Sequence, residues 1–268
     1  MTSAPVLLWR RLLAECLGSA FLAAVVIGSG IAAQRLSPGQ TGLELLENAA
    51  ATAAGLFAII LMFGPVSGGH FNPVVSFVDA VFGGLSWRDA TAYLPAQVAG
   101  CIAGAVAANL MFALPAVTIS AKHRASAAHF LSEVIATVGL VLVIFALARS
   151  GRSRSAPAAV GAYIGAAYWF TSSTSFANPA ITIGRMFSDT FAGIAPSSVP
   201  PFIGAQILGG VLAAGVIKAL YPAITPADAA GIIVPYDGEA GRAPSSAAHH
   251  SASLSADGSP GPASLTDN

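Results

Sequence analysis

The chain has 268 residues, of which 55% are hydrophobic and 9% are charged, and its mean hydropathy is +0.72. A soluble domain carries about 25% charged residues, and an alanine-rich soluble helical protein would show a polar face on its helices. The net charge is zero and the sequence has no basic run, which argues against nucleic-acid binding. The composition therefore predicts an all-α membrane protein.

A spanning helix needs about 20 mostly apolar residues. Six segments qualify, and two shorter apolar segments, each about half a span, follow the second and the fifth. Both short segments begin with Asn-Pro. The predicted spans are 12–33, 49–66, 92–116, 127–148, 156–176 and 201–221, and the predicted half-spans are 72–83 and 178–194.

Lysine and arginine are distributed unequally between the two sides of these six spans. One side carries Arg10, Arg11, Arg88, Arg149, Arg152, Arg154, Lys218 and Arg242, and the other carries Arg35, Lys122 and Arg124. The more basic side of a membrane protein is usually cytoplasmic. We therefore expect a multi-pass protein of the inner (plasma) membrane with both termini in the cytoplasm.

This orientation divides the chain into five regions. A tail rich in Ser, Ala, Gly, Pro and His ends the chain and is predicted to be disordered from about residue 237. The regions are a cytoplasmic N-terminus (1–10), a first repeat (11–116), an extracellular loop (117–126), a second repeat (127–221) and the C-terminal tail (222–268).

The two halves of the chain carry the same polar residues in the same order. A glutamate lies early in the first span of each half, Asn-Pro begins each half-span, and an Ala-Gln pair follows: the glutamates are Glu15 and Glu133, and the glutamines are Gln97 and Gln206. Because each half has three spans, the two copies must be inverted in the membrane. Inverted repeats with broken helices form pathways near the membrane midplane.

Asn-Pro is a signal for the start of a helix. Asparagine is a favoured N-cap, and proline suits the first helical position. Asn72 and Asn178 are thus predicted to begin two half-helices that enter from opposite faces and meet near the middle. Each helix N-terminus carries about half a positive charge, which opposes cations and protons, while the asparagine amides offer hydrogen bonds to a neutral solute.

The stretches SGGHFNPV and FANPA, with the paired glutamates and glutamines, resemble the aquaporin (major intrinsic protein) family over about residues 11–221. The resemblance implies six helices and two half-helices around one pore per subunit, assembled as a homotetramer in the lipid bilayer. It also implies passive flow of water or small uncharged solutes, with no cofactor and no metal.

The family motif is altered in the first half-span. The two triplets are Asn72-Pro73-Val74 and Asn178-Pro179-Ala180, and the family usually has alanine where this chain has Val74. We expect the bulkier Val74 to narrow or reshape the midpoint of the pore and to leave the Asn72 cap in place.

Counting along the family pattern also indicates a selectivity filter. The filter residues are Thr52, Ala166, Ser175 and Ile181, and Ile181 replaces the usual arginine. This filter should be wide and weakly charged. It resembles a bacterial aquaglyceroporin subgroup without the arginine, some members of which are associated with arsenic handling, and implies glycerol-like polyols, neutral metalloid acids such as arsenous acid, and water as solutes.

Two further residues are expected near the pore. Arg185 follows Ile181 by four residues, on nearly the same helix face and one turn farther out. We expect it to line the outer vestibule; the alternatives are that it reaches the membrane interface or pairs with Asp189. His70 is expected to line the cytoplasmic half of the pore or to act as a pH-sensitive gate, or else to be structural.

Ionisable groups inside spans are costly and have a function or a structural partner. By the resemblance, Glu15 and Glu133 brace the irregular loops before the half-helices, and Gln97 and Gln206 bond to neighbouring helices or loops. A proton relay through the glutamates is the alternative.

The leading functional hypothesis is a passive channel rather than an enzyme. A strict water channel with an unusual filter is one alternative, and an ion-coupled secondary transporter is another, with Glu15 and Glu133 as its candidate ion ligands. An intramembrane enzyme would have His70 and the same glutamates for acid–base chemistry, but no metal-binding or nucleophile motif is present.

Overall fold

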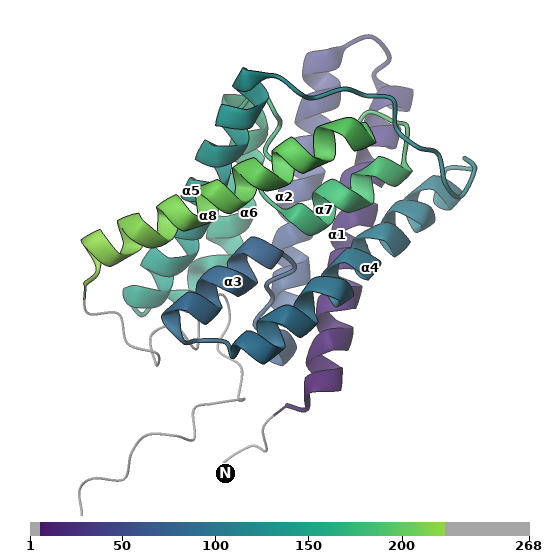
Figure 1. Cartoon of the computed structure of the whole chain (residues 1–268). Helices are drawn as coiled ribbons and strands as arrows, with labels where there is room; N and C mark the ends of the chain where they lie inside the picture. The colour runs from purple at the N-terminus through teal and green to yellow at the C-terminus, as the bar shows by residue number, and fades with distance from the viewer. Residues whose placement is uncertain (1–5, 223–268) are drawn as a thin grey trace, which may run out of the picture.

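The computed structural model describes residues 6–222, which fold into an all-helical bundle without strands in that range (Figure 1). The described chain has eight α-helices and three short 3₁₀ turns. The α-helices are α1 (Leu8–Leu36), α2 (Thr41–Ser67), α3 (Pro73–Phe82), α4 (Trp87–Met111), α5 (Ala127–Arg149), α6 (Ala156–Phe170), α7 (Pro179–Gly184) and α8 (Val199–Leu220). The 3₁₀ turns are Ser153–Ser155, Arg185–Phe187 and Pro196–Ser198. The predicted tail lies outside the described residues.

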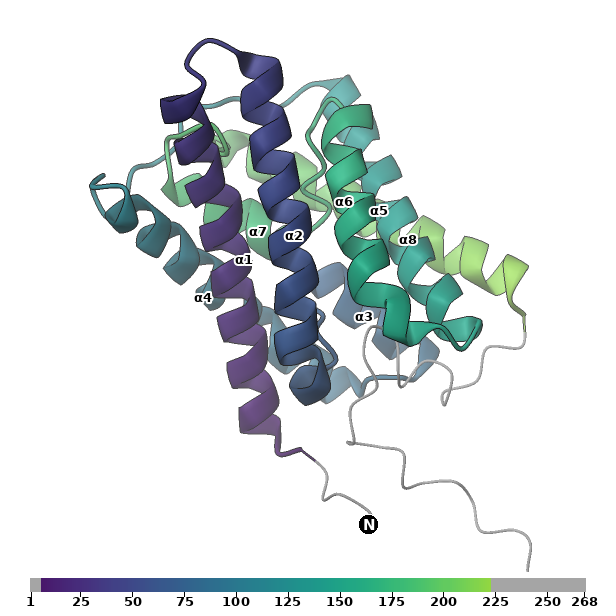
Figure 2. The ribbon, with the colours of Figure 1, turned by 180° about the vertical axis from the view of Figure 1, so that it is seen from behind.

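The packing of the helices repeats between the two halves. Helix α1 packs against α4 and α2, and α5 packs in the same way against α8 and α6. The short helices α3 and α7 contact each other, and each contacts both α4 and α8. Figure 2 shows α1, α2, α6 and α5 standing upright, with α4 and α8 crossing behind them. The two half-helices therefore lie inside a frame of six longer helices, as the inverted-repeat prediction required.

Five of the helices, α1, α2, α4, α5 and α8, are long and apolar enough to cross a membrane. The sixth, α6, has 15 residues and ends at Phe170, not at residue 176 as expected. Three residues after this end have positive φ angles: Thr174, Ser175 and Ala177. Residues 171–175 all carry hydroxyl side chains and no charge, so a hydropathy window that averages across them extends past the true end of the helix.

Helix α4 is displaced from its expected span, 92–116, by five residues toward the N-terminus. Its start is fixed by Ser86, whose side chain accepts a hydrogen bond from Asp89 N as an N-cap. Its end precedes Pro115, and proline disfavours helical backbone in the residue before it. Polar residues in the first turn lower the average hydropathy there, so a hydropathy window places the start of the helix too late.

The second half-helix is also shorter than the expected 178–194. Helix α7 ends at Gly184, one 3₁₀ turn follows, and Ser188 is extended with a φ of −140°. Asn109 on α4 fixes the chain at this point, because its Nδ2 donates to Phe187 O at 2.9 Å and its Oδ1 accepts from Ser188 Oγ at 2.7 Å. A polar contact with α4 thus accompanies the end of the helix.

Candidate functional site

The two Asn-Pro motifs meet at the centre of the bundle. Asn72 Oδ1 accepts from Val74 N at 3.0 Å, and Asn178 Oδ1 accepts from Ala180 N at 2.9 Å. Each asparagine therefore caps its own half-helix and keeps its amide nitrogen free to donate elsewhere. The sequence predicted both caps, and both are present.

Each amide nitrogen donates to the opposite loop. Asn72 Nδ2 bonds to Ala177 O and Asn178 Nδ2 bonds to Phe71 O, both at 2.7 Å. The two accepting residues share an uncommon left-handed conformation, with φ of 49° at Phe71 and 48° at Ala177. The same backbone geometry in both repeats turns each carbonyl toward the opposite asparagine and ties the two helix N-termini together.

The buried glutamates hold the loops that precede the half-helices. Glu15 accepts from His70 N at 3.0 Å and Phe71 N at 2.7 Å, and also from Ser67 Oγ and Gln97 Nε2. In the second repeat, Glu133 accepts from the backbone N–H groups of Phe176 and Ala177 at 2.9 and 2.8 Å, and from Gln206 Nε2. Both carboxylates are fully buried. Their oxygens thus supply acceptors for loop N–H groups that lack a secondary-structure partner.

Sequence reasoning missed a hydroxyl in each repeat. Ser76 and Thr182 both lie four residues after an asparagine, and each hydroxyl donates to that asparagine's carbonyl, at 3.2 and 2.8 Å. Each also accepts from the glutamine of its own repeat, at 3.1 and 2.9 Å. Both copies of the Asn-Pro motif have a hydroxyl residue four positions after the asparagine, and this repeated spacing in the sequence could have indicated Ser76 and Thr182.

A cavity of about 60 Å³ runs beside the two asparagines. This is room for several waters, since one water needs roughly 10–15 Å³ of such space. Its apolar wall comes from four helices, and on each helix the residues are spaced by four, so that they share one face. They are Leu22 and Val26 on α1; Thr52, Leu56 and Ile60 on α2; Leu140 and Ile144 on α5; and Val160, Ile164 and Tyr168 on α6.

This geometry matches a known family of channels. The model of the family described as "Major intrinsic protein" matches residues 2–175. The chain belongs to the major intrinsic protein (aquaporin) family.

Relatives of the chain include "Aquaglyceroporin AqpS" of Rhizobium meliloti (strain 1021), 48% identical over 219 residues that cover 82% of this chain and 93% of that protein. "Glycerol uptake facilitator protein" of Pseudomonas aeruginosa is 32% identical, with coverage of 85% and 95%. Among solved structures, the aquaglyceroporin from Plasmodium falciparum has a TM-score of 0.61 at 19% identity and covers 81% of this chain and 99% of its own, which shows the shared fold.

Three of the four residues expected in the aquaporin filter line the cavity: Thr52, Ser175 and Ile181. The fourth expectation was wrong in position, because Ala166 is exposed and does not line the cavity. Residues two apart on a helix point to nearly opposite sides, and Tyr168 instead faces inward, with its hydroxyl 3.3 Å from Thr52 Oγ1.

Val74, the departure from the family's alanine, does not line the cavity. It is buried against α8, where a methyl group added to Gly210 would lie only 2.5 Å from Val74 Cγ1. The expectation that Val74 narrows the midpoint is therefore not met, because the absence of a side chain at Gly210 makes room for the larger residue.

Arg185 lines the cavity and is buried, with 2% of its surface exposed. Its Nε donates to Ala192 O, and its guanidinium carbon lies 3.4 Å from the centre of the Phe176 ring. The alternative pairing with Asp189 does not form, because Asp189 Oδ1 accepts from Ala121 N and Ser120 Oγ. Burial also removes the alternative of an arginine that reaches the membrane interface.

His70 lies at the cavity wall near the start of α3. Its Nδ1 is 3.0 Å from Ser76 Oγ, and its Nε2 is 3.4 Å from Asp79 Oδ2. Asp79 was given no role from the sequence, although an acidic residue in an apolar half-helix is an expected sign of a partner. The ring thus both borders the cavity and joins a buried polar network.

The loop between α4 and α5 carries further positive charge close to the segment that follows α7. Arg124 Nε donates to Gly193 O at 3.0 Å, and burial lowers the pKa of Arg124 to about 10. Partial burial lowers the pKa of Lys122 to about 8, and the charges of Arg124 and Arg185 add to this effect. Neither Lys122 nor Arg124 lines the cavity.

Proposed function

We propose that this aquaporin-family member is a passive channel for water and for small uncharged solutes, namely glycerol-like polyols and neutral metalloid acids such as arsenous acid. The observation that carries the proposal is the cavity beside the two cross-bonded asparagines, at the N-termini of the two half-helices. Positive helix ends disfavour cations there, while neutral molecules pay no such penalty.

The composition of the cavity wall supports hydroxylated solutes. Aliphatic stripes from α1, α2, α5 and α6 provide an apolar surface, and polar groups provide a few fixed hydrogen-bond sites. Ser175 Oγ is buried without a hydrogen-bond partner among the described residues, so it is available to a solute. Ile181 places an aliphatic side chain where the family usually has arginine, which favours solutes larger than water. The names of two relatives, an aquaglyceroporin and a glycerol uptake facilitator, agree with this class of solute.

A secondary transporter is the less favoured alternative. An ion-coupled mechanism needs a group that can bind the coupling ion along the pathway, and the proposed candidates were Glu15 and Glu133. Both glutamates are fully buried, accept hydrogen bonds from loop N–H groups and glutamine, and do not line the cavity. They serve the fold better than they could serve an ion or a catalytic reaction.

We also propose a homotetramer in the inner membrane with both termini in the cytoplasm. Large apolar side chains are exposed on the outer faces of the long helices, among them Phe21, Leu61, Leu131 and Val211, which suits contact with lipid or with other subunits. The start of α1 and the end of α5 lie at the same end of the bundle (Figures 1 and 2). Arg10, Arg11 and Arg149 are therefore on one side, in agreement with the positive-inside rule.

The test uses the purified full-length protein in proteoliposomes and stopped-flow light scattering. Inward gradients of glycerol and of arsenous acid at neutral pH are compared with an osmotic gradient for water, with and without imposed proton and sodium gradients. A channel predicts solute entry that rises linearly with concentration and ignores the ion gradients. Saturable, ion-dependent entry would support the transporter, and water flow without solute entry would support the strict water channel.

A further inference from the structure

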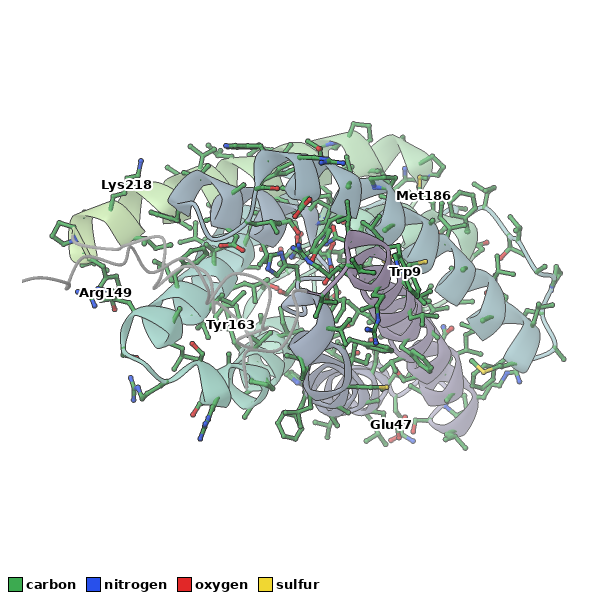
Figure 3. The ribbon with its side chains drawn as sticks, turned by 90° about the horizontal axis from the view of Figure 1, so that it is seen from below. Trp9, Glu47, Arg149, Tyr163, Met186 and Lys218 are labelled. Atoms are coloured by element: carbon green, nitrogen blue, oxygen red, sulfur yellow. The ribbon has the colours of Figure 1, made fainter. Side chains whose placement is uncertain are left out.

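The end of the cavity nearest the outer loops has an asymmetric wall. Thr52, Tyr168, Ser175 and Ile181 contribute hydroxyl and aliphatic groups. Arg185 contributes the one arginine or lysine side chain among the described lining residues. Figure 3 shows the bundle from below, that is, from the end where α1 starts. Met186, the neighbour of Arg185 in the chain, is labelled there beside α4.

The guanidinium is held in a fixed orientation. Phe176 supports one face of it at 3.4 Å from the ring centre, and Ala192 O accepts from Nε on its edge. The main chain at Phe176 is fixed because its N–H donates to Glu133 Oε1 at 2.9 Å, and its ring packs edge-on against Phe202 with 5.1 Å between the ring centroids. A planar group supported on one face and one edge keeps its remaining N–H donors in a defined direction.

Arg185 forms no ion pair with a carboxylate within residues 6–222. The ion pairs Arg11–Asp89 and His70–Asp79 involve other residues, and Asp189, the nearest acidic residue along the chain, accepts from Ser120 Oγ and Ala121 N instead. An arginine has five N–H donors, and in the described part of the chain the bond to Ala192 O is the one hydrogen bond that Arg185 makes. Four of its donors therefore have no protein partner among the described residues, and the positively charged side chain lines the cavity.

Residue spacing explains how the charge comes to be there. Ile181 and Arg185 are separated by four residues, so both project toward the cavity from one face of α7 and its 3₁₀ extension. Isoleucine at 181 leaves the position next to the asparagine caps apolar, and the longer side chain at 185 supplies the charge from one turn away.

We propose that Arg185 is the specificity-determining residue of the outer constriction: its displaced guanidinium binds acceptor oxygens of neutral solutes and repels protons and other cations. This inference rests on the proposed channel function. A fixed positive charge in a narrow, poorly solvated passage is an electrostatic barrier to cations, while Ile181 leaves more free width than an arginine at its own position would.

The test compares Arg185→Leu with Lys122→Gln, which removes a nearby positive charge that does not line the cavity. Proteoliposomes loaded with a pH-sensitive dye report proton entry under a potassium diffusion potential, and stopped-flow scattering reports water and glycerol entry. We expect Arg185→Leu to raise the proton leak at least about tenfold while Lys122→Gln leaves it unchanged. Water flow in Lys122→Gln should stay within about twofold of the wild type, which controls for correct folding and insertion.

Arg185→Lys provides an independent arm if the leucine variant does not fold. Lysine keeps the charge and loses the planar stack and the forked donors, so we expect the proton leak to stay low and the ratio of glycerol to water permeability to change at least about threefold.

The proposal is overturned if Arg185→Leu matches Lys122→Gln in proton leak and glycerol entry, or if Arg185→Lys leaves the permeability ratio unchanged. A wild type that passes water but no glycerol contradicts the proposed solute class; the proton-leak comparison then still decides the role of Arg185.

Discussion

Single side chains replace regular hydrogen bonding in the two loops that lead to the half-helices. Glu133 accepts from two consecutive loop N–H groups, Phe176 and Ala177, and from the amide of Gln206. A carboxylate is suited to this position because it accepts at both oxygens and donates at neither. The residue thus positions Ser175 and Asn178, which flank those N–H groups, without touching the cavity.

Glu133→Gln tests whether the carboxylate braces the loop through its bonds to the N–H groups of Phe176 and Ala177. The glutamine amide must place an NH₂ group where a backbone N–H now donates, so one buried donor loses its acceptor. We expect the free energy of unfolding in detergent to fall by about 1–3 kcal/mol, with a matching loss of water permeability per protein. Glu47→Gln is the control, because Glu47 bonds only to Ser37 Oγ among the described residues and lies far along α2 from the loop. Equal losses in the two variants would contradict the bracing role.

At the level of elements, the half-helices are positioned by the surfaces of α4 and α8. In the contact between α3 and α8, the side chain of Val74 packs against Gly210, which has no side chain of its own. A closely packed interior accepts such pairs but not an extra methyl group. The departure from the family's alanine is therefore compensated on the opposing helix.

Gly210→Ala should reduce stability by about 1–3 kcal/mol through overpacking against Val74, and Val74→Ala/Gly210→Ala should recover most of that loss. Gly204→Ala and Gly215→Ala, on the same helix with open space around them, should instead raise stability by up to about 1 kcal/mol because alanine favours helix. Chemical denaturation of these four variants and of Val74→Ala alone, all in one detergent, gives the comparison. Additive effects of Val74→Ala and Gly210→Ala would rule out the compensation.

The sequence predicts the order of the helices but not the positions of all their ends. Duplicated Asn-Pro motifs and long apolar runs predict the order of the helices, and the caps on Asn72 and Asn178 follow from local chemistry. Hydropathy could not find the ends of α6 and α7, because the residues after α6 are small and uncharged and those after α7 mix apolar and polar side chains, so an averaged window shows no sharp boundary at either end. Those ends depend on polar contacts with residues far along the chain, such as Asn109 with Ser188.

The prediction that Ala166 lines the filter was wrong for a related reason. Counting back from Asn178 presumes one fixed register between the end of α6 and the loop. The helix face was a better guide, because Val160, Ile164 and Tyr168 recur every four residues and Ala166 does not belong to that series. Arg185 was placed on the correct face by the same spacing, but its stacking on Phe176 depends on tertiary structure that no local pattern encodes.

For the whole molecule, the inversion of the repeats explains why two separate Asn-Pro motifs, at Asn72 and Asn178, border one cavity. Each half supplies a glutamate, a glutamine, a hydroxyl and an asparagine to the same set of hydrogen bonds, and each half supplies two helices to the cavity wall. Ser175, Ile181 and Arg185, which line the cavity, all come from the second repeat. Stability is thus shared between the repeats, and we expect solute selection to reside largely in the second one.

The central claim is that glycerol-sized solutes cross through the cavity beside the two asparagine caps. The most direct measurement is glycerol entry into proteoliposomes containing the wild type, Ile181→Trp or Ala166→Trp. Ile181 lines the cavity and Ala166 is exposed, so we predict that Ile181→Trp lowers glycerol entry at least about tenfold while Ala166→Trp stays near the wild type. Unchanged glycerol entry in a correctly folded Ile181→Trp protein would contradict the account.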